Sequence, residues 1–152
     1  MPPVVRLAPV TSANRPLLLA LVLPAEQQDF VASNAESLDE ADQNPACVPF
    51  AVTADGAVVG FAMYALDPDD GNYWVYRLMV DQRHQRRGIG RAALAQLITL
   101  MSALPNCPRI ILGVDPANFA ARALYESLGF KATGETTEGE DVMQLTLTAN
   151  QT

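Results

Sequence analysis

The stretch from Asp81 to Leu94 constrains the fold more than any other part of the sequence, because it joins a strand to a helix through a basic turn. The apolar run Tyr73 to Val80 precedes it, and apolar residues at helical spacing follow it. Glycine at positions 88 and 90 carries no Cβ atom, so a ligand can approach the backbone. The first amides of a helix lack intrahelical partners. The pattern therefore predicts an anion site suited to a diphosphate.

Composition restricts the class of partner. A length of 152 residues, 49% of them hydrophobic, predicts one globular domain over residues 1–152. Seventeen acidic against ten basic residues give a net charge of −7, which argues against nucleic acid or an anionic membrane and favours a neutral or cationic partner. The longest apolar run, Leu17 to Leu23, is far shorter than the roughly 20 residues of a membrane span. With no secretion signal in the sequence, we expect a cytoplasmic location.

The content of cysteine and histidine argues against a metal centre. Cys47 and Cys107 are far apart in the sequence, and His84 is the single histidine. Zinc sites in proteins need several such ligands at close spacing. We therefore expect no metal and two reduced, buried thiols.

Hydrophobic periodicity and turn residues predict the order β-α-α-β-β-β-α-β-α-β-β. The strand 73–80 is almost continuously apolar, so we expect it to be central and buried on both faces. Asp115 followed by Pro116 predicts the N-cap and first residue of a late helix. The expected strands are 4–10, 48–53, 58–66, 73–80, 109–114, 130–137 and 142–148, and the expected helices are 15–23, one or two within 26–41, one after Gly90 and one ending at Gly129.

Two motifs resemble those of one enzyme family. The segment from Gln85 to Gly90 matches the pattern Q-x-x-G-x-G, and the segment from Asn118 to Phe130 resembles N-x-x-A-x-x-L-Y-x-x-x-G-F. Both are similar to motifs of the GCN5-related N-acetyltransferases (GNAT). The resemblance implies a single-domain α/β (α+β) GNAT fold. It has a mixed, mostly antiparallel sheet of about six or seven strands, splayed between strands 4 and 5, with about four flanking helices.

The same resemblance implies acetyl-coenzyme A as co-substrate and assigns residues to it. Backbone amides around the two glycines would hold the diphosphate, and three residues of the preceding strand would lie beside the pantetheine arm. Asn118 would contact the coenzyme, and the Tyr125 hydroxyl would lie near its sulfur. The implied coenzyme residues are Leu78, Met79, Val80, Gln85, Arg86, Arg87, Gly88, Ile89, Gly90, Arg91, Asn118 and Tyr125.

The implied reaction is attack by a neutral amine on the thioester carbonyl within a ternary complex. A backbone amide near Val80 would stabilise the oxyanion, and Tyr125 would protonate the departing thiolate. The ordinary pKa values of tyrosine and a thiol, about 10 and 8.5, make that transfer feasible. A base must also take the proton of the amine. By chemistry the candidates are Glu36, Asp69, Asp70 and His84, with none preferred.

Local features resemble the bacterial spermine and spermidine (diamine) acetyltransferase branch. They are the segments 30–38, 73–81 and 134–140, although that branch commonly has Gly-Lys-Gly-Tyr-Gly where Arg86 to Gly90 stands here. Carboxylates at Glu26, Asp29, Glu36, Asp39 and Glu40 would attract a polycation. We therefore expect a small-molecule amine acceptor, contacted by Glu26, Glu36, Asp70 and Trp74.

Other functions remain open from the sequence. The acceptor could instead be a protein N-terminus, a lysine or an aminoglycoside-type amine, or the chain could be a non-catalytic coenzyme A-binding module. An NAD-dependent oxidoreductase fits badly, because Ala93 stands near the place of a third glycine. The family resemblance also implies that the chain could form a homodimer.

Overall fold

The computed structural model describes residues 2–147, which form one seven-stranded sheet in the order β1-β2-β3-β4-β5-β7-β6. The pairs are antiparallel except β4 with β5, so the predicted mixed, mostly antiparallel sheet and element order are confirmed. The strands are β1 (Val5–Pro9), β2 (Cys47–Ala54), β3 (Ala57–Leu66), β4 (Tyr73–Val80), β5 (Arg109–Val114), β6 (Lys131–Thr137) and β7 (Glu140–Thr146). The helices are α1 (Arg15–Leu19), α2 (Asn34–Gln43), α3 (Ile89–Ser102) and α4 (Phe119–Ser127), with short 3-10 turns η1 (Ala25–Gln27) and η2 (Gln82–His84).

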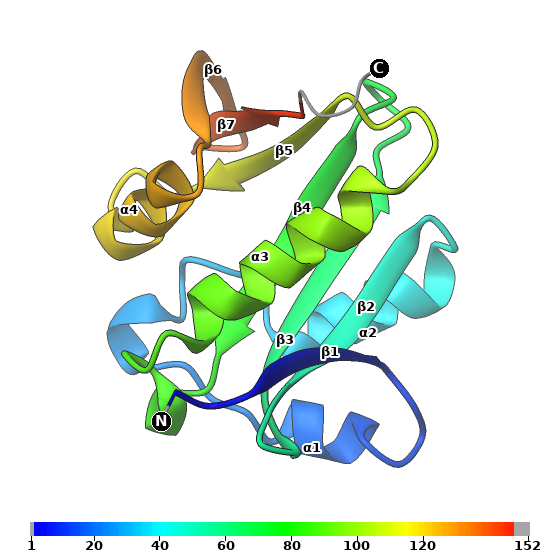
Figure 1. The fold of residues 1–152 in the computed structure, drawn as a ribbon, viewed down its shortest axis with the longest axis vertical. Coiled ribbons are helices and arrows are strands. Elements are labelled where there is room, and N and C mark those ends of the chain that lie inside the picture. The colour runs from blue at the N-terminus through cyan, green and yellow to red at the C-terminus, as the bar shows by residue number, and fades with distance from the viewer. Residues whose placement is uncertain (1, 148–152) are drawn as a thin grey trace.

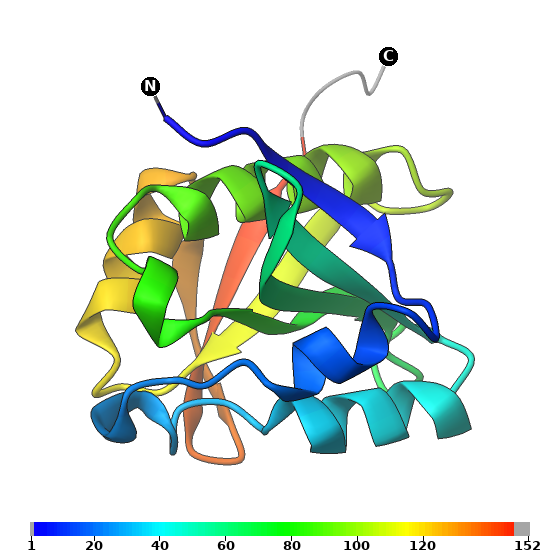
Figure 2. The same cartoon turned by 90° about the horizontal axis from the view of Figure 1, so that it is seen from below.

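Helix α3 covers one face of the sheet and helices α1 and α2 cover the other (Figures 1 and 2), and an apolar core lies on each face. On one face, Leu94, Leu97 and Met101 of α3 are completely buried, as their spacing predicts. On the other face, Leu18 of α1 and Leu38 of α2 pack in a second cluster with residues of β2 and β3. Fully burying one such side chain stabilises the fold by about 1.5–3 kcal/mol. The two cores thus hold the sheet between the helices.

Strands β4 and β5 separate along their length. They pair only from Tyr73 opposite Ile110 to Val75 opposite Leu112, which confirms the predicted splay. Strand β4 is central, as predicted, and each of its faces packs against one of the two cores, but its burial is less complete than predicted. Only Val75 and Met79 are buried in it, because the separation opens this part of the sheet.

Two local predictions needed correction, and one open alternative was resolved. The first helix ends at Leu19 instead of residue 23, and the chain beyond it is extended, with Val22 donating a hydrogen bond to Asp81. The acidic segment at 26–41, predicted as one or two helices, forms two short elements, η1 and α2. Asp115 accepts a hydrogen bond from Ala117 in a turn, and Asn118 is the N-cap of α4. Among the residues the structure describes, no helix is long and apolar enough to cross a membrane.

Candidate functional site

Helix α3 begins without a capping side chain. Its N-cap is Gly88, in the left-handed conformation with φ +78°, and a Cβ atom there would meet nothing within 4 Å. The first helical bond runs from the Ala92 amide to the Gly88 carbonyl, so the amides of Ile89, Gly90 and Arg91 precede it. Such amides and the helix dipole together favour an anion. The structure therefore leaves this helix end open for a ligand.

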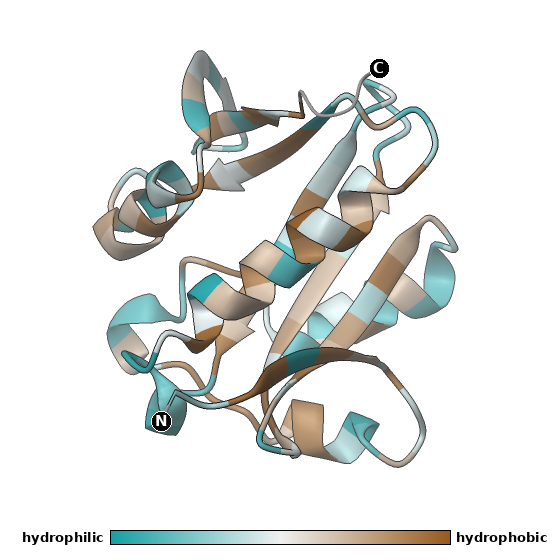
Figure 3. Ribbon diagram, viewed as in Figure 1, coloured by the Kyte–Doolittle hydropathy of each residue, from teal (hydrophilic) through white to brown (hydrophobic). Residues whose placement is uncertain are grey.

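Arginines surround this open end. Arg86 and Arg87 are exposed, and neither forms an ion pair within residues 2–147. Arg91 donates to the Ser127 hydroxyl of α4, which joins the two helices. Figure 3 shows hydrophilic residues gathered in the segment before α3. The local charge is thus positive in a chain whose net charge is −7.

Gln85 and Asp81 hold the turn before α3 in place through hydrogen bonds to other segments. The Gln85 side-chain amide exchanges hydrogen bonds with Gln27 and donates to the Val80 carbonyl at 2.9 Å. Asp81 is 1% exposed and accepts hydrogen bonds from the Val22 amide and from Arg83. Burial alone would raise the pKa of Asp81, but these hydrogen bonds and the Arg83 charge lower it below its ordinary value. Both side chains are thus positioning residues.

One edge of β4 faces the gap left by β5. The Asp81 amide donates to the Val59 carbonyl near the start of β3, and backbone groups alternate between the two edges of a strand. The backbone groups of Leu78 and Val80 therefore point the other way, toward β5. No strand of the described residues pairs with β4 there beyond Val75. An extended ligand can add to this edge in the way that a strand would.

Helix α4 brings Tyr125 to this gap. Asn118 caps the helix, its Oδ1 accepting from the Ala121 amide at 3.2 Å. Tyr125 lies two turns later, packs against Phe130 and lines a large cleft. Burial, and then the charge of Glu140, raise the pKa of Tyr125 to about 12. The hydroxyl thus keeps its proton at neutral pH, and the high pKa suits a hydrogen-bond donor better than a strong acid.

The cleft has a volume of about 1280 Å³ and is predominantly acidic. It lies between the segment before α2, the splayed strands and the β6–β7 hairpin. Two arginines, Arg77 and Arg109, also line it. Its nine carboxylates belong to Asp29, Glu36, Glu40, Asp67, Asp69, Asp70, Glu135, Glu138 and Glu140. The electrostatic field of such a wall attracts a cation and repels an anion.

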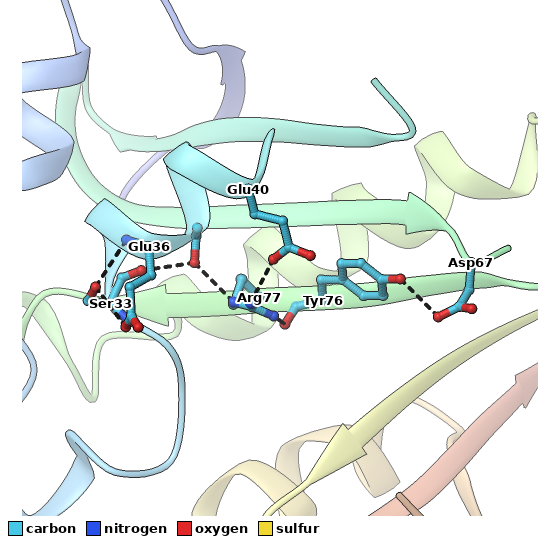
Figure 4. A network of polar contacts seen from close by, with 7 residues as sticks. Ser33, Glu36, Glu40, Asp67, Tyr76 and Arg77 are labelled. Carbon is cyan, nitrogen blue, oxygen red and sulfur yellow. Dashed lines mark hydrogen bonds and ion pairs between the residues drawn. The ribbon is translucent and has the colours of Figure 1, made fainter. Parts of the chain in front are cut away.

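Arg77 belongs to a network that connects α2 with β4 (Figure 4). Its guanidinium group donates to Ser37, to the Tyr76 carbonyl and to Glu40, the last at 3.0 Å. The Tyr76 hydroxyl donates in turn to Asp67 at 2.9 Å. Burial and then the Asp67 hydrogen bond raise the pKa of Tyr76, so it too stays protonated. These contacts fix one wall of the cleft.

The expected acceptor residues fall in different places. Glu36, Asp70 and Trp74 line the cleft, whereas Glu26 lies outside it, on η1. The Trp74 indole donates to Asp70 at 3.0 Å. Of the candidate bases, Asp69 also lines the cleft, but His84 does not. Its Nδ1 lies 3.4 Å from Asp81 without a hydrogen-bond partner among the described residues.

The expected coenzyme residues also differ in their surroundings. Leu78 and Tyr125 line the cleft, whereas Ile89 is buried in the core, so only its backbone can reach a ligand. The Met79 side chain is buried on the face of the sheet that α1 and α2 cover, and it accepts a weak hydrogen bond from Asn34. The sequence reasoning missed Glu140, whose place after a Glu-Gly turn is typical of a solvated charge. The alternation of Glu140, Val142 and Gln144 along one face of β7 was the available signal.

Comparisons with known proteins agree on one family. Residues 18–130 match the acetyltransferase (GNAT) family. The spermine/spermidine N(1)-acetyltransferase of Bacillus subtilis is 34% identical over 88% of this chain and 93% of its own. The ribosomal protein bS18-alanine N-acetyltransferase of Escherichia coli is 32% identical over 69% of each chain. The structure of an aminoglycoside acetyltransferase, AAC(6')-Ib, in complex with coenzyme A has a TM-score of 0.78 and 18% identity, over 94% of this chain and 95% of its own.

Proposed function

The chain belongs to the acetyltransferase (GNAT) family and is an acetyl-coenzyme A-dependent N-acetyltransferase, and we propose that it acetylates a polyamine such as spermidine or spermine. The observation that carries the proposal is the cleft, in which nine carboxylates face two arginines. A polyamine carries several positive charges along a flexible chain, so a wall of separated carboxylates can bind them together. The Bacillus subtilis relative, named for spermine and spermidine, supports the same acceptor.

The residues at the open end of α3 fit the coenzyme. Amides from Gly88 to Arg91 would hold its diphosphate, and the unpaired Arg86 and Arg87 would add positive charge. The edge of β4 at Leu78 and Val80 would pair with the pantetheine arm. Asn118 already caps α4 through its oxygen, so its amide nitrogen is the group left for the coenzyme. The coenzyme supplies the acetyl group, as a thioester whose sulfur leaves when the amine attacks.

The chain's own groups would then promote the transfer. The backbone amides on the β4 edge near Val80 would donate hydrogen bonds to the carbonyl oxygen as it gains negative charge. Tyr125 would donate a hydrogen bond to the departing sulfur, because its raised pKa keeps the hydroxyl protonated. The acidic cleft would hold the amine next to both groups.

An acetyl-transfer screen tests the acceptor. Spermidine, an N-terminal peptide of a ribosomal protein and an aminoglycoside are compared at equal concentration with acetyl-coenzyme A. We expect kcat/KM to be at least tenfold higher with spermidine. A higher value for the peptide or the aminoglycoside would overturn the polyamine proposal. Coenzyme binding without transfer to any amine would support a non-catalytic module instead.

The variant Tyr125→Phe tests the role of the hydroxyl. We expect kcat to fall by about 100-fold or more, the usual range for loss of a proton donor, with little change in coenzyme affinity. An unchanged kcat would remove Tyr125 from the mechanism.

A cytoplasmic location, one domain over residues 1–152 and a homodimer stay predictions from the sequence.

A further inference from the structure

Glu140 lies over a glycine on the neighbouring strand. It is the first residue of β7, directly after the turn at Glu138 and Gly139. A Cβ atom built on Gly113 of β5 would lie 2.5 Å from Glu140 Oε1. Any other residue at position 113 would therefore push the carboxylate away. The missing side chain makes room for the Glu140 carboxylate on the cleft wall.

Glu140 and Tyr125 line the same cleft. The charge of Glu140 contributes to the raised pKa of Tyr125. Tyr125 comes from α4 and Glu140 from the β6–β7 hairpin, and Glu140 lies against Gly113 near the end of β5. Strand β4 has already separated from β5 at this level. A hydroxyl and a carboxylate thus both line the cleft in which the acetyl group would be transferred.

The other carboxylates of the cleft differ from Glu140 in their contacts. Four have partners: Glu36 binds Ser33, Glu40 binds Arg77, Asp67 binds Tyr76 and Asp70 binds Trp74. Another four are exposed to solvent: Asp29, Asp69, Glu135 and Glu138. Glu140 is half-buried, and its carboxylate has no hydrogen bond or ion pair within residues 2–147. Of the nine, it alone combines partial burial with a free carboxylate.

We propose that Glu140 is the catalytic base that accepts the proton of the attacking amine. The inference rests on the acetyltransferase function and holds for whichever amine proves to be the acceptor. As the bond from nitrogen to the carbonyl carbon forms, the nitrogen gains positive charge and its proton becomes acidic. Glu140 takes that proton, the bond from carbon to sulfur breaks, and the sulfur gains a proton from Tyr125 or water. Water then removes the proton from Glu140 and restores Tyr125.

The surroundings of Glu140 make its carboxylate a stronger base than an ordinary glutamate. Burial, and then the negative charge of Asp115, raise the pKa of Glu140; Glu138 raises it further and Arg77 opposes the shift. A carboxylate with a raised pKa holds a proton more firmly than an ordinary one does. Tyr125 keeps its proton at neutral pH and so adds no charge to the cleft there.

The variant Glu140→Gln tests the proposal against Glu126→Gln, which removes one charge from the exposed side of α4. We expect Glu140→Gln to lower kcat by 100-fold or more, with KM for the amine and calorimetric affinity for coenzyme A changed less than threefold. Wild-type kcat should fall as pH drops through the pKa of Glu140, and this dependence should be absent in the variant. Glu126→Gln should retain kcat and the wild-type pH profile.

Two further variants distinguish loss of the catalytic carboxylate from loss of the folded structure. Gly113→Ala keeps Glu140 but places a methyl group where its carboxylate lies, so kcat should fall at least tenfold while thermal unfolding changes little. Glu140→Ala should regain activity when formate is added, because a small carboxylate can enter the vacated space.

Several outcomes would overturn the proposal. Unchanged kcat in Glu140→Gln would do so, and a loss confined to KM and to calorimetric binding of the amine would make Glu140 an anchor for the cation. A wild-type protein that acetylates no amine would instead refute the proposed function, which the wild-type screen reveals independently of these variants.

Discussion

Helices α2 and α3 begin in opposite ways. At α2, the Ser33 hydroxyl accepts from the Glu36 amide, and the Glu36 carboxylate accepts from the Ser33 amide. At α3, Gly88 offers no side chain, and the first amides stay open. The N-terminus of α2 is occupied by a carboxylate of its own helix and cannot receive an anion. The N-terminus of α3, which begins after a glycine, can receive one. The chain thus satisfies one helix end internally and leaves the other to a ligand.

The two ends also differ in how they are held. The capping box of α2 uses only neighbours in the sequence. The turn before α3 depends on distant contacts, because Asp81 binds Val22 and Gln85 binds Gln27, 59 and 58 residues away. An uncapped binding loop therefore needs support from elsewhere in the fold.

Placing a carboxylate at the N-terminus of α3, as α2 already has, should have the largest effect of the changes that test this difference. In Gly88→Asp the new charge lies beside the expected diphosphate, with a repulsion of about 1–4 kcal/mol, so we expect coenzyme A affinity to fall by about 100-fold. Gly88→Asn is the matched neutral control, because asparagine tolerates a positive φ. Calorimetry measures both. Equal affinities for the two variants would contradict an anion site at this turn.

Removing the distant support should have a smaller effect. Asp81→Asn places an amide against the donors of Val22 and Arg83, so we expect a loss of about 1–3 kcal/mol in the free energy of unfolding. Urea denaturation at neutral pH measures this loss. Equal stabilities there would show that Asp81 does not support the turn.

The pH dependence of that difference follows from the lowered pKa of Asp81. The contribution of its carboxylate is fully present above the unfolded value of about 4, and it is lost as pH falls through the lower folded pKa. The stabilities of wild type and Asp81→Asn should therefore converge in acid. Divergence on acidification would contradict the direction of the shift.

Removing the internal cap should have the smallest effect. In Ser33→Ala the Glu36 amide loses its partner, so we expect a loss of about 1 kcal/mol in unfolding free energy. Coenzyme A affinity should not change, because α2 is remote from the α3 turn in the fold (Figure 2). A weaker affinity would mean that the two helix ends are coupled.

Local patterns accounted for most of the fold. The order of elements, the central position of β4 and the glycine turn before α3 could all be predicted, because they depend on short-range periodicity and on residues with special backbone freedom. The start of α4 could not, since Asp115 and Asn118 are both acceptable caps three residues apart. Which one caps the helix depends on packing.

The wall of the cleft was harder to predict than the turn. Carboxylates before α2 could be selected by charge, yet Glu26 lies outside the cleft and Glu140 is inside it. The contact of Glu140 with Gly113 exists only because β5 and β7 pair in one register. Such a contact leaves no mark in the residues next to either position. Tertiary pairing, which no local pattern records, decides which charges meet.

Trp74 is the single tryptophan of the chain, and its indole N–H binds Asp70 in the cleft. The fluorescence of an indole ring responds to nearby charge, and no other tryptophan contributes to the signal. In the proposed function, an ammonium group that enters the cleft and draws Asp70 toward itself would change the fluorescence of Trp74. Tryptophan fluorescence would therefore report amine binding without an added label, and a stopped-flow experiment could follow it before the acetyl group is transferred.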